Sequence, residues 1–206
     1  MQSLKPAKGT QELVVENGGL KLLVPQGIYV PSDDSLLLAA AVSKFARGRF
    51  LDLGCGTGIQ GITASQNPNV TEVVFADVNP KAILAAKDNV SKNDMGKPGT
   101  FIQTDLFSNL EGGRFGTIAF NPPYLPTEKD EDIAWDGGRD GRKLTDKFLL
   151  EFEAHLEKRG TLLLLQSSLS GTEKTVKALE KKGFLVSNEG SAYFFFEELQ
   201  VLKAVR

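Results

Sequence analysis

The chain has 206 residues, 41% of them hydrophobic and 24% charged, with a formal net charge of −2. This length and balance predict one soluble globular domain over residues 1–206, and the slight acidity argues against a broad basic surface for nucleic acid. Cys55 is the only cysteine, which excludes an intrachain disulfide and a cysteine-rich metal site, so no metal is expected. The apolar runs are too short to span a membrane, and residues 1–10 lack a signal-peptide core, which predicts a cytoplasmic protein.

The first half of the chain alternates strand and helix patterns after a polar start. Residues 1 to about 18 are expected to be loosely ordered. Ser32 or Asp33 is the expected N-cap of the first helix, and Asn79 with Pro80 begins the third. Strands are predicted over residues 20–24, 49–53 and 72–76. Helices are predicted from about 33 through 42, from 59 to about 66, and from 80 to about 92.

The second half continues the alternation and ends in two strands. Strands are predicted over residues 100–103, 115–120, 161–166, 184–187 and 193–205, and helices from 144 to about 158 and from 172 to 182. A long polar loop covers residues 125–144, and loops of that length in a compact domain are usually functional or mobile. The last two strands are close in sequence, so they should pair antiparallel.

The alternation implies an α/β fold: a mainly parallel sheet with helices on both faces and an antiparallel C-terminal strand. This pattern resembles the class I methyltransferase fold, which is Rossmann-like.

A glycine-rich segment follows the strand at 49–53. Gly56 to Gly61 satisfies G-x-G-x-x-G, and Asp77 follows at the distance expected for a ribose-binding acid, so a dinucleotide-dependent oxidoreductase is a serious alternative. Asp52 separates the two hypotheses. A carboxylate directly before the glycines would repel a pyrophosphate, whereas it would favour a cationic ammonium group.

Residues 52–58, Asp-Leu-Gly-Cys-Gly-Thr-Gly, look like the glycine-rich motif of methyltransferases that use S-adenosylmethionine (SAM). That resemblance implies cofactor contacts from Asp52 and from the backbone at Gly54 and Gly56. It implies that Asp77 holds ribose, and that Asp105 and the Leu106 amide hold adenine. Ser35 and the free amides at its helix end are candidates to bind the carboxylate of the ligand.

The segment Asn121-Pro122-Pro123-Tyr124 follows an apolar strand at the edge where α/β proteins bind ligands. Each proline restricts the residue before it, so Asn121 and Pro122 are held extended. The Asn121 side-chain oxygen and the Pro122 carbonyl are therefore predicted to accept both hydrogens of an NH2 group and to orient its nitrogen for methyl transfer. Tyr124 is predicted to cover a planar amide or base by stacking.

Together, residues 29–35, 120–126 and 134–142 resemble the HemK-related class I release factor glutamine methyltransferases of the short archaeal and eukaryotic type. The resemblance implies N5-methylation of the glutamine in a Gly-Gly-Gln loop of a translation release factor. It also implies a small zinc-binding activator subunit as a possible partner. Arg139 and Arg142 would anchor the substrate peptide. A nucleic-acid amine or protein lysine is the alternative acceptor, and a catalytically silent scaffold is the alternative to an enzyme.

Overall fold

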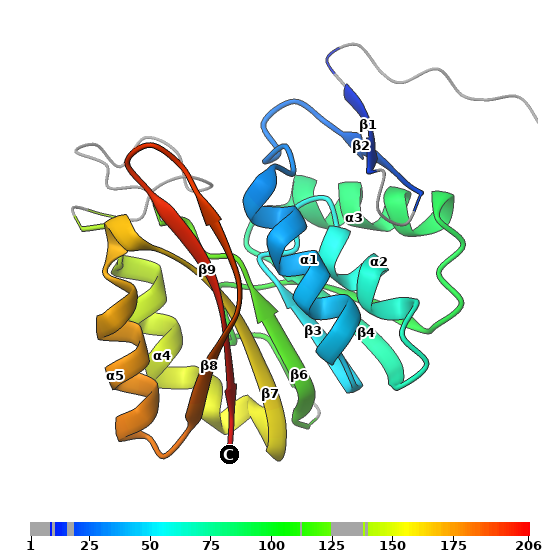
Figure 1. Cartoon of the computed structure of the whole chain (residues 1–206). Helices are drawn as coiled ribbons and strands as arrows, with labels where there is room; N and C mark the ends of the chain where they lie inside the picture. Colours follow the sequence, from blue (N-terminus) through cyan, green and yellow to red (C-terminus); the bar gives the residue numbers. More distant parts are fainter. Residues whose placement is uncertain (1–8, 10, 16–18, 112, 125–137, 139) are drawn as a thin grey trace, which may run out of the picture.

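The computed structural model describes residues 9, 11–15, 19–111, 113–124, 138 and 140–206. Its centre is a seven-stranded sheet with the order β5-β4-β3-β6-β7-β9-β8 (Figure 1). The strands are β3 (Gly48–Leu53), β4 (Val70–Asp77), β5 (Gly99–Gln103), β6 (Phe115–Phe120), β7 (Leu156–Ser167), β8 (Leu185–Tyr193) and β9 (Glu198–Val205). Strands β3 to β7 pair in parallel, and β9 inserts antiparallel between β7 and β8. The predicted mainly parallel sheet with an antiparallel C-terminal strand is confirmed.

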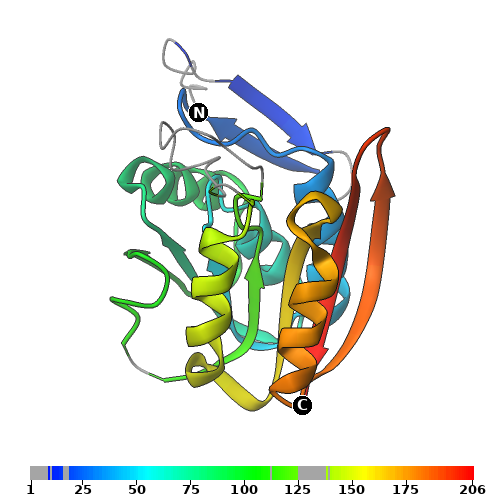
Figure 2. The same ribbon diagram turned by 90° about the vertical axis from the view of Figure 1, so that its left-hand side faces the viewer.

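Helices cover both faces of this sheet, as predicted (Figures 1 and 2). One face carries α1 (Asp33–Phe45), α2 (Ile59–Ser65) and α3 (Pro80–Lys92), and the other carries α4 (Lys143–His155) and α5 (Thr172–Lys181). Neighbouring residues of one strand enter different cores: Phe50 packs in the cluster with Leu38 of α1, and Leu51 in the cluster with Phe148 of α4. Burial on both faces explains why the central strands are continuous apolar runs.

A separate two-stranded sheet, β1 (Gln11–Val15) with β2 (Leu20–Val24), lies in the N-terminal part of the chain. The stretch expected to be loosely ordered thus contains a strand. Asn89 of α3 and Asn93, the C-cap of that helix, attach β2 to the domain. Each side-chain amide both donates to and accepts from the backbone of one β2 residue, Leu23 for Asn89 and Lys21 for Asn93, at 2.7–2.9 Å. The two asparagines, one helical turn apart, pair with β2 as a neighbouring strand would.

The largest differences from the predicted boundaries lie at the end of α4 and in the last two strands. The helix predicted to run to residue 158 ends at His155, because Leu156 already pairs with Phe115 of β6. The aromatic run beginning at Tyr193 was predicted to start the last strand. Instead Tyr193 ends β8, and residues 194–197 form the turn into β9, closed by the Phe194 amide donating to the Glu197 carbonyl at 2.7 Å. Aromatic residues favour strands, which explains the second error.

None of the described helices combines the length and the apolar character needed to cross a membrane.

The packing of α2 against β4 depends on Gly61. A Cβ atom added there would lie 2.2 Å from Cε1 of Phe75, a buried ring that stacks on Phe101 with centroids 4.9 Å apart. We expect Gly61→Ala to lower the free energy of unfolding by about 1–3 kcal/mol, the usual cost of overpacking a core. Urea unfolding of the two proteins measures this change.

Gly96→Ala is the matched control, because no atom of the described residues lies within 4 Å of its added Cβ. Equal losses of stability in the two variants would contradict the packing argument.

Candidate functional site

A cavity of about 740 Å³ opens at the carboxyl edge of β3, β4 and β6. Its volume suits a small-molecule ligand, and this edge is where open α/β sheets bind ligands. The sequence-predicted site residues that line it are Ser35, Asp52, Gly54, Gly56, Asp77, Asp105, Leu106, Asn121, Pro122, Pro123 and Tyr124. Arg139 lies outside the described residues.

Asp77 fixes the glycine-rich segment to the end of β4. Its Oδ2 accepts a hydrogen bond from the Gly56 amide at 3.0 Å, and its Oδ1 accepts one from the Asn79 amide at 2.8 Å. Gly56 has φ +51° and Gly54 has φ +64°, a left-handed backbone that favours glycine. Each carboxylate oxygen keeps a lone pair for a ligand hydroxyl. Burial raises the pKa of Asp77 above its ordinary value.

Asp52 is 1% exposed and accepts a hydrogen bond from the Gly61 amide at 2.8 Å. Burial raises the pKa of this carboxyl group well above its ordinary value, and the nearby Asp77 adds to the rise. A cation bound in the cavity would favour the ionised carboxylate, whereas a phosphate would meet two acids. The charge around the loop therefore favours a positively charged ligand group.

Gln60 is a lining residue that sequence reasoning missed. Its Nε2 donates to the Ser35 carbonyl at 2.9 Å, which leaves Oε1 buried without a hydrogen-bond donor from any described residue. A buried acceptor without a partner costs free energy, so a ligand donor would stabilise it. Gln60 occupies a variable position of the G-x-G-x-x-G motif, and the motif assigns a role only to the glycines.

Asp105 and Leu106 form another part of the cavity wall, after β5. The Asp105 carboxylate accepts a hydrogen bond from Nζ of Lys147 at 2.7 Å, and both side chains are largely exposed. Leu106 has φ +48°, a strained conformation for a residue with a side chain, and that side chain is buried. Such strain gathers at functional sites.

Asp34, in the first turn of α1, is the residue that connects the site, and sequence reasoning assigned it no role. Its Oδ2 accepts from the Tyr29 hydroxyl at 2.6 Å, from Nδ2 of Asn121 at 2.9 Å and from the Tyr124 hydroxyl at 3.4 Å. Its Oδ1 accepts from the Ser35 amide at 2.5 Å and the Ser35 hydroxyl at 3.1 Å. Asp34 is 3% exposed, so these five donors compensate a buried carboxylate.

The contact with Asp34 also fixes the Asn121 amide. An ionised carboxylate can only accept hydrogen bonds, so the NH2 end of Asn121 must lie against it. Oδ1 of Asn121 is then left buried, with no hydrogen-bond donor from the described residues. Because this oxygen is closed to water, neighbouring groups must move before a donor reaches it. The structure thus holds an unsatisfied acceptor in the wall of the cavity.

The two tyrosines near Asp34 stay protonated. Burial and the Asp34 carboxylate raise the pKa of Tyr29 and of Tyr124 far above their ordinary values. Both hydroxyls therefore act as hydrogen-bond donors at neutral pH and not as bases. Ser35 lines the cavity, and its amide and its hydroxyl both donate to Asp34.

Arg142 does not act as a free substrate anchor. It is 5% exposed, and its Nη1 donates to the carbonyls of Ser170 and Gly171 and to Oγ1 of Thr175 at 2.8–3.2 Å. Its Nη2 donates to Asp146 at 2.6 Å. These bonds join the start of α4 to the segment before α5, so Arg142 has a structural role.

Comparisons with known proteins show relatives of this chain. A Methanocaldococcus jannaschii protein named as a protein N5-glutamine methyltransferase is 38% identical over 200 residues, covering 94% of this chain and 100% of its own. The release factor glutamine methyltransferase of Deinococcus radiodurans is 32% identical over 164 residues, 73% of this chain and 58% of its own. The catalytic subunit mtq2 of the Schizosaccharomyces pombe eRF1 methyltransferase is 27% identical, covering 91% of this chain and 93% of its own.

Solved structures show the same fold. The E. cuniculi Mtq2–Trm112 complex matches with a TM-score of 0.70 at 24% identity, covering 88% of this chain and 99% of that one. The T. thermophilus 16S rRNA N2 G1207 methyltransferase, in complex with AdoMet and guanosine, matches with a TM-score of 0.71 at 20% identity over 96% of this chain and 50% of that one. The fold is the class I methyltransferase fold. The family model of the methyltransferase small domain matches residues 32–191, and the chain belongs to this family.

Proposed function

We propose that this methyltransferase uses SAM to methylate the N5 side-chain nitrogen of glutamine in the Gly-Gly-Gln loop of a translation release factor. The observation that carries the proposal is the buried, unsatisfied Oδ1 of Asn121, whose orientation Asp34 fixes. Relatives covering most of this chain are named for protein glutamine or release factor methylation.

The cavity fits SAM by the chemistry of its wall. Asp52 and the unsatisfied Oε1 of Gln60 suit the ammonium group, Asp77 suits the ribose hydroxyls, and Asp105 with Leu106 suits adenine. Bound SAM supplies an electrophilic methyl group on a sulfonium. The acidic wall also suits its positive charge, whereas a dinucleotide would bring phosphates next to Asp52 and Asp77.

The acceptor is a poor nucleophile, because the lone pair of an amide nitrogen is delocalised into the carbonyl. Asn121 Oδ1 and the Pro122 carbonyl accept the two N–H hydrogens and hold the nitrogen in one orientation. Both oxygens stabilise the positive charge that develops on that nitrogen during transfer. The Asp34 carboxylate polarises the Asn121 amide and makes its oxygen a stronger acceptor. Tyr124 covers the plane of the acceptor amide.

The proposal extends to a partner. The E. cuniculi structural neighbour is a complex with Trm112. We infer that this chain likewise pairs with a small zinc-binding activator subunit, and co-expression followed by gel filtration would test the pairing.

The decisive test is methyl transfer itself. The protein, with radiolabelled SAM, is incubated in parallel with a release factor, with tRNA and with duplex DNA. We expect label on the release factor, and mass spectrometry should place one added methyl group on the glutamine of its Gly-Gly-Gln loop. Label on nucleic acid alone would move the acceptor to a nucleobase amine, and binding of NAD without SAM would end the proposal.

Asp34→Asn removes the charge that fixes the Asn121 amide while keeping the size of the side chain. We expect kcat to fall roughly 10- to 100-fold, as for second-layer partners of catalytic groups, with little change in the Kd for SAM. Asn121→Ala should lose more, roughly 100- to 1,000-fold, because it removes the acceptor oxygen itself.

Asp33→Asn is the matched control, since Asp33 is the exposed neighbour on the same helix turn. If Asp34→Asn and Asp33→Asn had equal turnover, Asp34 would have no part in positioning Asn121.

SAM binding should release protons from Asp52. Burial raises the pKa of Asp52 in the ligand-free protein, and a bound ammonium favours the ionised form, so binding lowers that pKa. SAM affinity should therefore increase with pH between the ordinary carboxyl pKa and the raised one. Asp52→Asn should weaken SAM binding roughly 10- to 100-fold, the loss of a charge-assisted hydrogen bond.

Calorimetric titration in two buffers with different ionisation enthalpies counts the protons released per SAM bound. The count should fall in Asp52→Asn. An unchanged count would assign the proton to another group, with Asp77 the nearest candidate.

A further inference from the structure

The end of β8 and the turn into β9 carry four consecutive aromatic residues, Tyr193, Phe194, Phe195 and Phe196, which we name the aromatic tip. Their side chains are 77%, 44%, 92% and 81% exposed. Because these rings stay exposed to water, they contribute little to the stability of the fold. Contiguous exposed apolar patches usually mark interaction sites. Leu169, on the short 3₁₀ helix that follows β7, is 47% exposed and lies at the same edge of the sheet.

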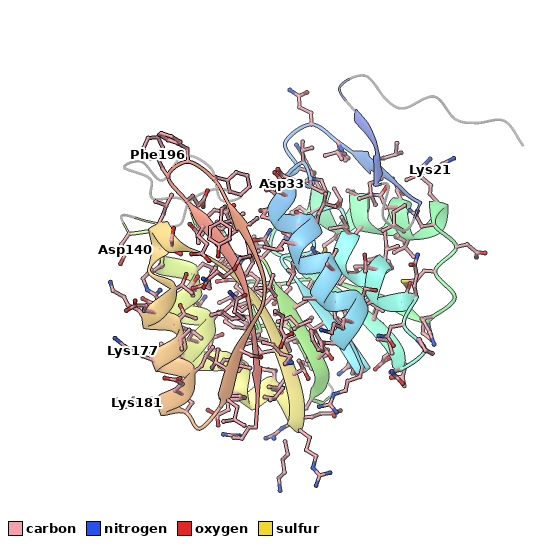
Figure 3. All side chains as sticks on the ribbon, viewed as in Figure 1. Lys21, Asp33, Asp140, Lys177, Lys181 and Phe196 are labelled. Atoms are coloured by element: carbon pink, nitrogen blue, oxygen red, sulfur yellow. The ribbon has the colours of Figure 1, made fainter. Side chains whose placement is uncertain are left out.

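The aromatic tip lies at the end of the molecule where the cavity opens. Ser167 ends β7, and its hydroxyl donates to Glu197 at 2.6 Å, while the Glu198 amide donates to Ser168 at 3.0 Å. Figure 3 shows Phe196 and Asp33, the first residue of α1, at this same end. Glu197 is close enough to contribute to the raised pKa of Tyr124 in the cavity wall.

The backbone of the aromatic tip is fixed in advance. The amides of Phe194 and Glu197 each donate to the carbonyl of the other, at 2.7 and 3.4 Å, and the bonds to residues 167 and 168 tie the turn to β7. A surface that is already ordered loses less conformational entropy on binding. The exposed rings are thus presented in one arrangement.

The charges around the aromatic tip favour a protein partner. Glu197 and Glu198 directly follow the aromatic tip, and residues 184–202 contain neither lysine nor arginine. Acidic flanks would be repelled by an anionic lipid surface and by a phosphate backbone. Aromatic rings next to acids instead complement a protein surface that combines apolar and basic side chains.

We propose that the aromatic tip is the docking surface for the protein that carries the acceptor glutamine. The rings would pack on that protein beside its acceptor loop, so that the loop enters the cavity at Asn121. The inference rests on the proposed function and deepens it, because it assigns recognition of the whole acceptor protein to a surface outside the cavity.

The test uses the double variant Phe195→Ser/Phe196→Ser. Methylation is measured on the full-length release factor and on a short peptide with the same Gly-Gly-Gln sequence. We expect kcat/KM for the release factor to fall roughly 10- to 100-fold, the usual effect of removing aromatic anchors from an interface. The value for the peptide should change less than about two-fold, since a peptide does not need the docking surface. Calorimetric Kd for the release factor should rise by the same factor as kcat/KM falls.

Leu185→Ser is the matched control. Leu185 is 76% exposed at the opposite end of β8, so its replacement should leave kcat/KM unchanged for both the release factor and the peptide. Equal loss on peptide and protein, or no loss on either, would overturn the docking role. Binding of the wild-type chain to phosphatidylserine vesicles, lost in the double variant, would overturn it in favour of a membrane. Wild-type protein that methylates neither substrate would refute the proposed function itself, and the docking role with it.

Discussion

The site depends on one buried carboxylate. Asp34 is almost fully enclosed, and it collects hydrogen bonds from Tyr29, Ser35, Asn121 and Tyr124. A buried charge is tolerated only when such donors surround it, and the amino end of α1 adds the favourable end of the helix dipole. The same bonds that stabilise Asp34 join the segment before α1 to the segment after β6. They also determine which end of the Asn121 amide stays unpaired.

The register of the parallel strands brings the other site residues to the same edge. Leu53 of β3 pairs with Ala76 of β4 on one side and with Phe120 of β6 on the other. The residues that follow these three, Gly54, Asp77 and Asn121, therefore lie side by side at the carboxyl edge of the sheet. Each strand is apolar on both faces, so a shift of register would expose or misplace core side chains on both sides. The stability of the two cores thus fixes the alignment of the proposed cofactor and acceptor regions of the cavity.

Much of this arrangement could be predicted from sequence, because its signals are local. The glycines, the acid after each strand and the Asn-Pro-Pro-Tyr segment lie within a few residues of a recognisable strand end. The fold followed from the alternation of helix and strand patterns. The role of Asp34 could not be predicted, because its partners Asn121 and Tyr124 lie 87 and 90 residues away. Arg142 is a similar case, since its partners on the segment before α5 are about 30 residues away and only the fold buries it there.

The aromatic tip was wrongly predicted as the start of a strand for a related reason. Aromatic residues favour strands when a sheet or a helix covers them, but the run from Tyr193 to Phe196 lies at a turn and stays exposed. The cavity and this tip carry different chemistry. The described cavity wall offers oxygens and acids that suit a sulfonium and an NH2 group. An NH2 group does not distinguish one protein from another, because every glutamine and asparagine carries one. Selection of one protein therefore requires contacts beyond the cavity, and the aromatic tip provides the exposed apolar surface, at the correct edge of the sheet, that such contacts need.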